Sequence, residues 1–146
     1  GPRQYALTQQ HKHLKEMIAI CKHDNAPAFC PIVGDFYSGM EVTVHVHGVK
    51  VSEIAECYGA YYGVDGISKD SGKPGLVFFA EDPAAAEGGF MSSAAYSGRD
   101  SLEVSVYGND ERILLCARYD NLGKGASGAA VQCMNISMGV DEGLGL

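Results

Sequence analysis

The sequence lacks an excess of basic residues, a long apolar run and an apolar leader, and each absence excludes a class of protein. It has 11 Lys and Arg residues against 18 Asp and Glu residues, a net charge of -7, whereas a nucleic-acid-binding face would be basic. No apolar stretch approaches the roughly 20 residues of a membrane-spanning helix. Gly1-Pro2, followed by polar residues, resembles a tag remnant rather than a signal peptide. We therefore expect no nucleic-acid or membrane partner.

Paired cysteine motifs are also missing. The chain has five cysteines, an odd number, with no CxxC spacing. Each has apolar or helical neighbours in the sequence, where a free cysteine behaves as a small hydrophobic residue. The sequence therefore predicts free thiols and a cytoplasmic protein. The cysteines are Cys21, Cys30, Cys57, Cys116 and Cys133.

What the chain does have is the composition of one soluble domain. Its 146 residues are 46% hydrophobic and 20% charged, as in ordinary globular proteins. No internal repeat or linker divides the sequence. We expect a single domain over residues 1–146.

The spacing of apolar residues predicts the secondary structure. Helices are expected over residues 8–23, 51–62 and 124–138, with Thr8 capping the first and Gly139 ending the last. Strands are expected over 28–33, 40–49, 76–80, 102–107 and 112–119, with a hairpin turn at 108–111. Residues 63–75 are predicted to be a loop, and 81–100 stay unassigned. The order predicts an α+β fold, a mixed, largely antiparallel sheet covered by helices on one face. The opposite face would be available for a dimer interface.

A polar cluster lies near the start of the first predicted helix. It consists of Tyr5, His11, His13 and Glu16. Histidine can exchange a proton near neutral pH, and a nearby glutamate can orient it. His13 and Glu16 share a helix face at a spacing of three, whereas His11 joins them only if the helix begins near residue 12. The alternative is a solvated helix start without chemistry.

Two further patterns have weaker functional interpretations. His45 and His47 face the same side of a predicted strand, as metal ligands would, but no third ligand is evident, so we expect no metal site. Residues 123–128 match GxGxxG before a helix, but too few residues follow to complete a dinucleotide-binding unit. That segment is either a helix start with free N–H groups and Lys124 for an anion, or a site of close helix packing.

Longer motifs resemble one enzyme family. Residues 117–132 read ARYDNLGKGASGAAVQ and are followed by Met134-Asn135. Together they resemble the closing signature of N-acetyl-gamma-glutamyl-phosphate reductases. The HKHLKEM stretch at 11–17, with Tyr5 before it, is similar to the HxHxxE segment of the family. PIV at 31–33 and FYSGM at 36–40, followed by VTV at 42–44, also fit.

The resemblance implies a glyceraldehyde-3-phosphate dehydrogenase-like C-terminal domain for catalysis and dimerisation. Members of the family use NADPH to reduce an acyl phosphate to a semialdehyde in arginine biosynthesis, through a cysteine thioester. By the same resemblance, His11 would be the base beside the thiol, and Tyr5, His13 and Glu16 would bind the substrate. The terminal GKGxxG helix would pack near the cofactor, which places Asn121, Gly123, Lys124 and Gly125 there.

Several departures from the family pattern limit what this chain can do. We expect the N-terminal dinucleotide-binding domain of the family to be absent, and no cysteine has the Gly-Cys-Tyr neighbours of the nucleophile: Cys57-Tyr58 lacks the glycine. Ser38 and Cys133 stand where the family often has Arg and Asn. We therefore expect a homo-oligomer that is inactive alone and does not bind NADP. The alternatives are a standalone dimeric scaffold and a metal-binding protein.

Overall fold

The computed structural model describes residues 1–64 and 75–146. The chain forms two compact units, Gly1–Phe36 and Tyr37–Leu146. The loop predicted over 63–75 lies almost entirely outside the described residues.

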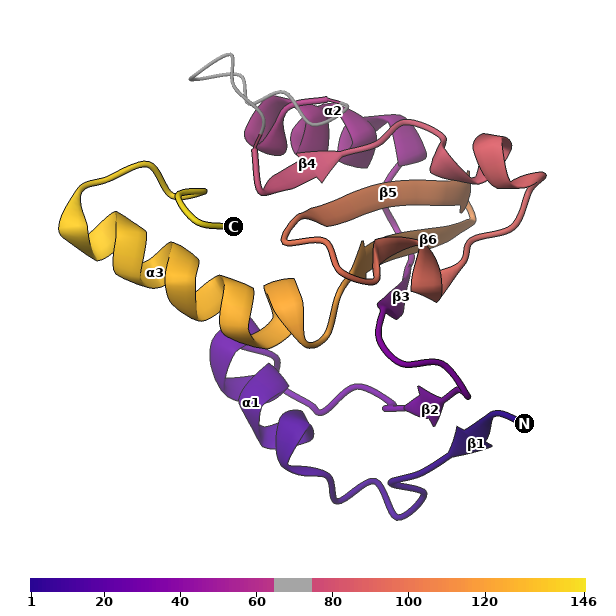
Figure 1. Cartoon of the computed structure of the whole chain (residues 1–146). Helices are drawn as coiled ribbons and strands as arrows, with labels where there is room; N and C mark the ends of the chain where they lie inside the picture. Colours follow the sequence, from indigo (N-terminus) through magenta and orange to yellow (C-terminus); the bar gives the residue numbers. More distant parts are fainter. Residues whose placement is uncertain (65–74) are drawn as a thin grey trace. The chain divides into compact units, whose positions relative to one another are not determined.

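The first unit consists of one helix and a pair of two-residue strands (Figure 1). Helix α1 spans Lys12–Cys21, and β1 (Arg3–Gln4) pairs antiparallel with β2 (Ile32–Val33). The strand predicted over 28–33 is therefore much shorter than expected.

Helix α1 begins four residues later than the predicted start at Thr8, so that assignment is wrong. Ala6 and Gln9 have left-handed backbones, with φ of 53° and 54°. The Ala6 carbonyl accepts the Gln9 N–H at 3.0 Å. This turn contains Thr8 and prevents a helix there, and His11 caps α1 instead.

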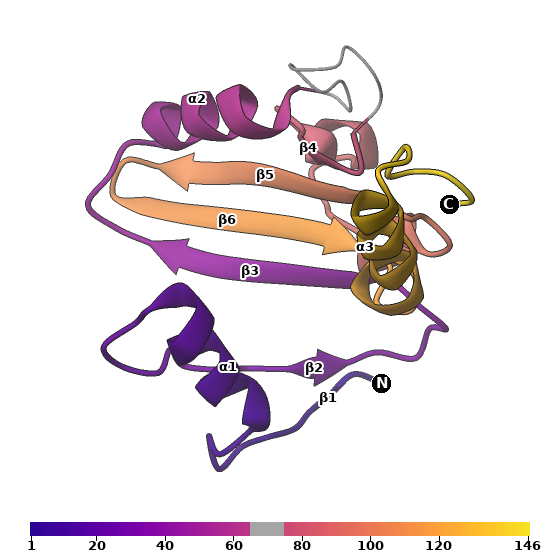
Figure 2. The same cartoon turned by 90° about the vertical axis from the view of Figure 1, so that its left-hand side faces the viewer.

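The second unit is built on a four-stranded sheet in the order β3-β6-β5-β4 (Figure 2). Among the strands that the structure describes, β4 and β5 are parallel, while the other two pairs are antiparallel. The predicted mixed, largely antiparallel sheet is thus confirmed. The strand bounds are β3 Met40–Val46, β4 Val77–Phe79, β5 Leu102–Asn109 and β6 Arg112–Tyr119.

Helix α2, Val51–Tyr62, packs on one face of this sheet and covers its core, as Figures 1 and 2 show. The core is centred on Phe79, Val106 and Ile113. The hairpin turn between β5 and β6 also holds α2, because the Asp110 carboxylate accepts the N–H of Val51 at 3.1 Å and so satisfies a free donor at the helix start.

The opposite face of the sheet is polar. Glu103 and Tyr107 alternate with the core-facing residues of β5 and so point away from α2. Two 3-10 turns, Pro83–Glu87 and Ser93–Tyr96, lie within the segment that the sequence left unassigned. They bind this face through hydrogen bonds: the Ala84 N–H donates to the Tyr107 hydroxyl at 2.8 Å, and the Tyr96 hydroxyl donates to Glu103 at 2.8 Å.

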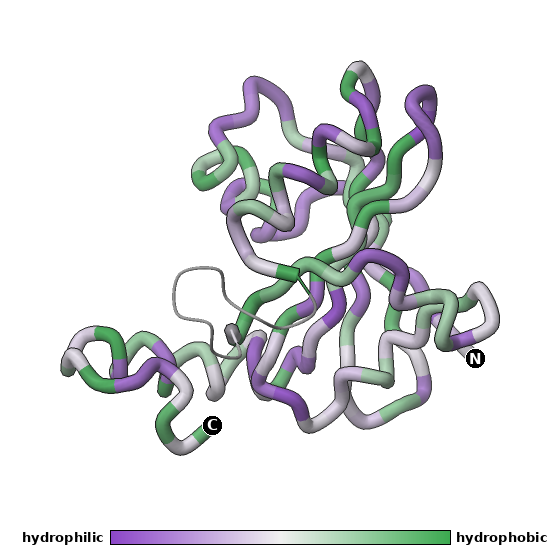
Figure 3. The backbone as a smooth tube through the Cα atoms, turned by 90° about the horizontal axis from the view of Figure 1, so that it is seen from above, coloured by the Kyte–Doolittle hydropathy of each residue, from purple (hydrophilic) through white to green (hydrophobic). Residues whose placement is uncertain are grey.

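Helix α3 closes the chain. It spans Gly128–Met138, after a π-helical turn at Gly123–Ser127, and ends at Gly139 with φ of 70°. The predicted helix and its stop are confirmed, but its first turn has i to i-5 hydrogen bonds. Hydrophobic and hydrophilic stretches alternate along this part of the trace (Figure 3), and Met134, Ile136 and Met138 are exposed.

Gly108 and Gly48 both have left-handed backbones, but only at Gly108 would an added Cβ also overlap another atom. A Cβ at Gly108, where φ is 105°, would lie 2.1 Å from the Arg112 carbonyl oxygen, whereas one at Gly48, where φ is 80°, would meet no atom within 4 Å. We expect Gly108→Ala to lower the free energy of unfolding by about 2 kcal/mol and Gly48→Ala by about 1 kcal/mol. Urea unfolding of both variants measures the difference, and equal losses would contradict the overlap at Gly108.

Candidate functional site

His11 lies where the chain enters α1, and its imidazole caps the helix. Its Nδ1 accepts the backbone N–H of His13 at 3.3 Å. The ring contacts three others, with centroid distances of 4.6 Å to His13, 5.3 Å to Phe29 and 5.8 Å to Tyr5. The predicted condition for a shared site, a helix that begins near residue 12, is met. Tyr5, His11 and His13 therefore form one cluster.

Glu16 extends this cluster along α1. Its Oε2 lies 3.7 Å from Nε2 of His13, one helical turn away. Both side chains are about half exposed, so the pair would contribute little to stability. The arrangement does, however, place a carboxylate where it can attract a protonated His13.

Two members of this site were missed from the sequence, Gln9 and Phe29. The carboxamide of Gln9 binds the backbone of Phe29 twice, since its Nε2 donates to the carbonyl at 2.7 Å and its Oε1 accepts the N–H at 2.8 Å. These bonds position the Phe29 ring beside both histidines. No local sequence pattern predicts a contact between Gln9 and Phe29, which are 20 residues apart.

The second group of predicted residues lies around Asp120, at the end of β6. The buried Asp120 carboxylate accepts the N–H groups of Gly98, Leu122 and Gly123 and the hydroxyl of Ser38. The backbone N–H donors of Gly98 and Gly123, with smaller help from the others, lower the pKa of Asp120 to about 2.

The residues expected near a cofactor have their polar groups engaged within the fold. Asn121 Oδ1 accepts the Gly39 N–H at 2.9 Å, and the Gly125 N–H donates to the Asp120 carbonyl at 2.8 Å. Because the Asp120 carboxylate takes the Gly123 N–H at 3.0 Å, the expectation of free N–H groups for an anion is wrong at these positions. The packing alternative holds at Gly128, where a Cβ would lie 2.2 Å from Asp100 Oδ1.

Lys124, the fourth of these residues, is also engaged. Its ammonium donates to Gln132 Oε1, and Gln132 Nε2 in turn donates to Glu142 Oε2 at 2.8 Å. Burial lowers the pKa of Lys124. Asn135 completes the arrangement by donating to the carbonyls of Glu142 and Leu144, which holds the C-terminal residues on α3.

The remaining candidates do not form a second site. His47 Nδ1 lies 3.1 Å from the Glu111 carbonyl oxygen, and within residues 1–64 and 75–146 no three His, Cys, Asp or Glu side chains are placed to hold a metal. All five cysteines are free. Across the same ranges no helix is long and apolar enough to cross a membrane.

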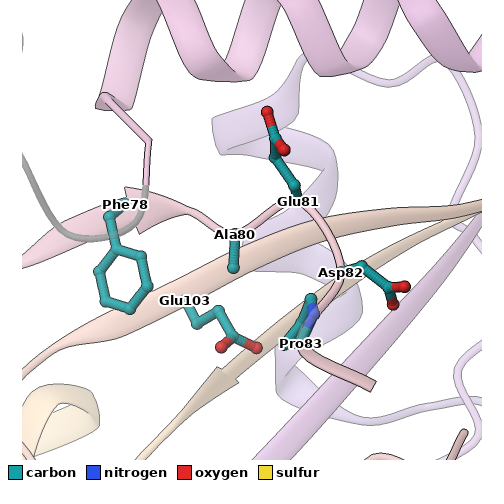
Figure 4. Close-up of a pocket in the computed structure, with 6 residues that line it drawn as sticks. All are labelled: Phe78, Ala80, Glu81, Asp82, Pro83 and Glu103. Atoms are coloured by element: carbon teal, nitrogen blue, oxygen red, sulfur yellow. The ribbon is translucent and has the colours of Figure 1, made fainter. Parts of the chain in front are cut away.

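An open pocket of about 490 Å³ lies beside β4 and β5 (Figure 4). The Glu103 carboxylate lies between the Phe78 ring and Pro83, while Glu81 and Asp82 point away from it. Glu103 is already bound by Arg118 and Tyr96, so its oxygens are not free for a ligand. No predicted site residue lines this pocket.

Several known proteins that are similar to this chain share one name. No protein-family model matches. N-acetyl-gamma-glutamyl-phosphate reductase 2 of Nostoc sp. is 37% identical over 150 residues, covering 97% of this chain and 45% of that protein. The reductases of Trichormus variabilis and Mesorhizobium japonicum are 37% and 35% identical, over 97% and 93% of this chain. The chain spans less than half the length of these relatives. Along nearly its whole length, it is homologous to a part of the N-acetyl-gamma-glutamyl-phosphate reductases.

Proposed function

We propose that this chain is the C-terminal, substrate-side part of an NADP-dependent N-acetyl-gamma-glutamyl-phosphate reductase of arginine biosynthesis, in a cytoplasmic homo-oligomer. The observation that carries the proposal is the cluster of Tyr5, His11 and His13 at the start of α1. It joins the side chains of the HxHxxE-like segment in a chain whose relatives bear that name.

The proposed reaction needs a thiolate that this chain does not supply in the family's sequence context. Attack of the thiolate on the acyl phosphate forms a carbon–sulfur bond and releases phosphate. NADPH supplies the hydride that reduces the resulting thioester to the semialdehyde and frees the thiolate. In this scheme His11 is the acid–base group, and Tyr5, His13 and Glu16 contact the substrate.

The negative charge of the substrate suggests how His13, with Glu16 beside it, would contact the substrate. An acyl phosphate is anionic, so a protonated His13 would attract it, and Oε2 of Glu16 lies 3.7 Å from Nε2 of the same ring. Tyr5 borders the same space through its edge contact with His11. The substrate phosphate is therefore proposed to lie beside His13.

The residues proposed to lie near NADP already form hydrogen bonds within this chain. We propose that they pack against the cofactor and do not bind its phosphates. Gly123 and Gly125 already donate their N–H groups to Asp120, and Lys124 donates to Gln132. Asn121 holds Gly39. We therefore propose that this chain alone neither binds NADP nor turns over.

In the complete reductase, we expect His11→Ala to lower kcat by about 100-fold or more, because an acid–base group typically contributes that much. His23→Ala is the matched control, since this exposed histidine follows α1 and lies outside the cluster, and we expect its kcat within about twofold of the parent. NADPH oxidation with the acyl phosphate measures both. Parental turnover in His11→Ala would contradict the proposal, and a parent protein without reductase activity would favour the scaffold alternative.

A further inference from the structure

The carboxamide of Gln9 stands where a strand partner for Phe29 is missing. β1 and β2 pair in an antiparallel register, and the Tyr5 N–H continues it by donating to the Pro31 carbonyl at 3.1 Å. In the same register Leu7 would lie opposite Phe29. The left-handed turn that ends at Gln9 takes the backbone out of this register first.

The side chain of Gln9 forms both of the bonds that a backbone partner would have formed. Its Nε2 donates to the Phe29 carbonyl at 2.7 Å, and its Oε1 accepts the Phe29 N–H at 2.8 Å. A carbonyl can only accept and an N–H can only donate, so these partners fix the orientation of the amide. Nε2 also donates to the Ala6 carbonyl at 3.3 Å, which anchors the carboxamide to its own turn.

The backbone of Phe29, held in this way, sets the position of its ring. The ring centroid lies 5.3 Å from that of His11 and 6.1 Å from that of His13. Phe29 follows α1 in the chain, so these contacts depend on what fixes the segment around residue 29. We propose that Gln9 is a positioning residue of the acyl-phosphate site, which through Phe29 keeps His11 and His13 in place to act on the substrate. The inference rests on the proposed function.

The turn alone does not explain a glutamine at this position. A positive φ favours glycine, and among other residues asparagine or aspartate, whereas Gln9 has a φ of 54°. What glutamine adds is a longer side chain with an amide at its end, which reaches the Phe29 backbone. The residue type therefore matches the contact with Phe29 rather than the backbone of the turn.

Gln9→Gly separates the two roles, because glycine suits the left-handed backbone and removes the carboxamide. By NMR on this chain, we expect the ring signals of His11 and His13 to move toward their positions in Phe29→Leu, which lacks the aromatic ring. The signals of His23 should stay in place. Exchange of the Tyr5 N–H and of the α1 amides should match the parent, since only the ring contacts are lost. Unmoved signals of His11 and His13 would overturn the inference.

The second measurement is turnover in the complete reductase. We expect Gln9→Gly to lower kcat about 10-fold or more, since a displacement of about 1 Å at a catalytic group can cost about 100-fold. Gln9→Glu keeps the length and the acceptor but, when ionised, cannot donate to the Phe29 carbonyl, so its kcat should lie between those of Gln9→Gly and the parent. Gln10→Ala, at the adjacent exposed glutamine, is the control and should stay within about twofold of the parent.

The outcomes separate this inference from the function on which it rests. If the parent reduces the acyl phosphate and His11→Ala does not, but Gln9→Gly has parental kcat, the inference fails and the function stands. If the parent shows no reduction, the proposed function fails, and a positioning role in that reaction fails with it. The NMR spectra of this chain then still show whether Gln9 holds Phe29 against the two histidines.

Discussion

Arg118→Met should lower the free energy of unfolding of the Tyr37–Leu146 unit by about 3–5 kcal/mol, because it leaves a buried carboxylate without its cation. Arg118 is 2% exposed, and its Nε donates to Glu103 Oε1 at 2.8 Å, while Nη1 binds Glu87. Burial alone would lower the pKa of Arg118, but the hydrogen bonds to Glu103 and Glu87 more than offset it and raise the pKa. The guanidinium is therefore charged in the folded state.

Urea unfolding of this chain measures the loss, and Arg112→Met is the matched control. Arg112 is on the same strand and pairs with Glu111 at 3.0 Å, but both side chains are more than 70% exposed. Exposed pairs contribute little, so we expect about 0.5 kcal/mol or less there. Adding Glu103→Gln to Arg118→Met should recover part of the loss, since it removes the unpaired charge. Similar losses at the two arginines would contradict a buried ion pair.

Asp120→Asn should cost about 3 kcal/mol and also change the acid stability of the unit. One oxygen would become an NH₂ group facing donors such as the Gly98 N–H or the Ser38 hydroxyl, and hydrogen bonds to a charged acceptor each contribute about 1.5–3 kcal/mol. The pKa of Asp120 is lowered to about 2 in the folded chain. Its contribution is therefore fully present above about pH 4 and is lost as the pH falls through about 2.

The free energy of unfolding between pH 2 and pH 5 tests this directly. The parent should lose stability mainly below about pH 4 as the pH falls towards 2, and Asp120→Asn should show a shallower slope there. Asp82→Asn is the control, because Asp82 is exposed and forms no cap to its helix, and its slope should match the parent. An unchanged slope in Asp120→Asn would mean that this carboxylate does not hold the turn.

The strands of the four-stranded sheet and α2 could be predicted from sequence because their apolar residues follow the spacing of a strand or a helix. Val42, Val44 and Val46 alternate along β3 as expected, and α2 has the predicted bounds. The start of α1 could not be predicted, since the left-handed backbone of Gln9 leaves no trace in apolar spacing. The structure of residues 81–100 could not be predicted for another reason. This segment is held by polar contacts to the sheet, such as the hydrogen bond from Tyr96 to Glu103.

Some contacts of the candidate site could likewise be predicted from sequence, and others could not. The HxHxxE-like spacing predicted that His11 and His13 would meet if the helix began near residue 12, and the structure confirms this. The bonds from Gln9 to Phe29 join distant segments and have no sequence signature. Near the C-terminus, the glycine pattern suggested free N–H donors, but the neighbouring Asp120 is the acceptor that takes them.

The π-helical turn at Gly123–Ser127 gives α3 one residue more than a regular helix would need to cover the same path. Each residue in an α-helix advances the side chains by about 100° around the axis. Removing one residue from this turn would let an ordinary helix cover the same path, so the side chains of Gly128–Met138 would keep their directions, whereas removing one residue from the regular helix would rotate the side chains that follow it by that angle. The wide turn therefore absorbs one extra residue ahead of α3 without changing which side of this helix is exposed.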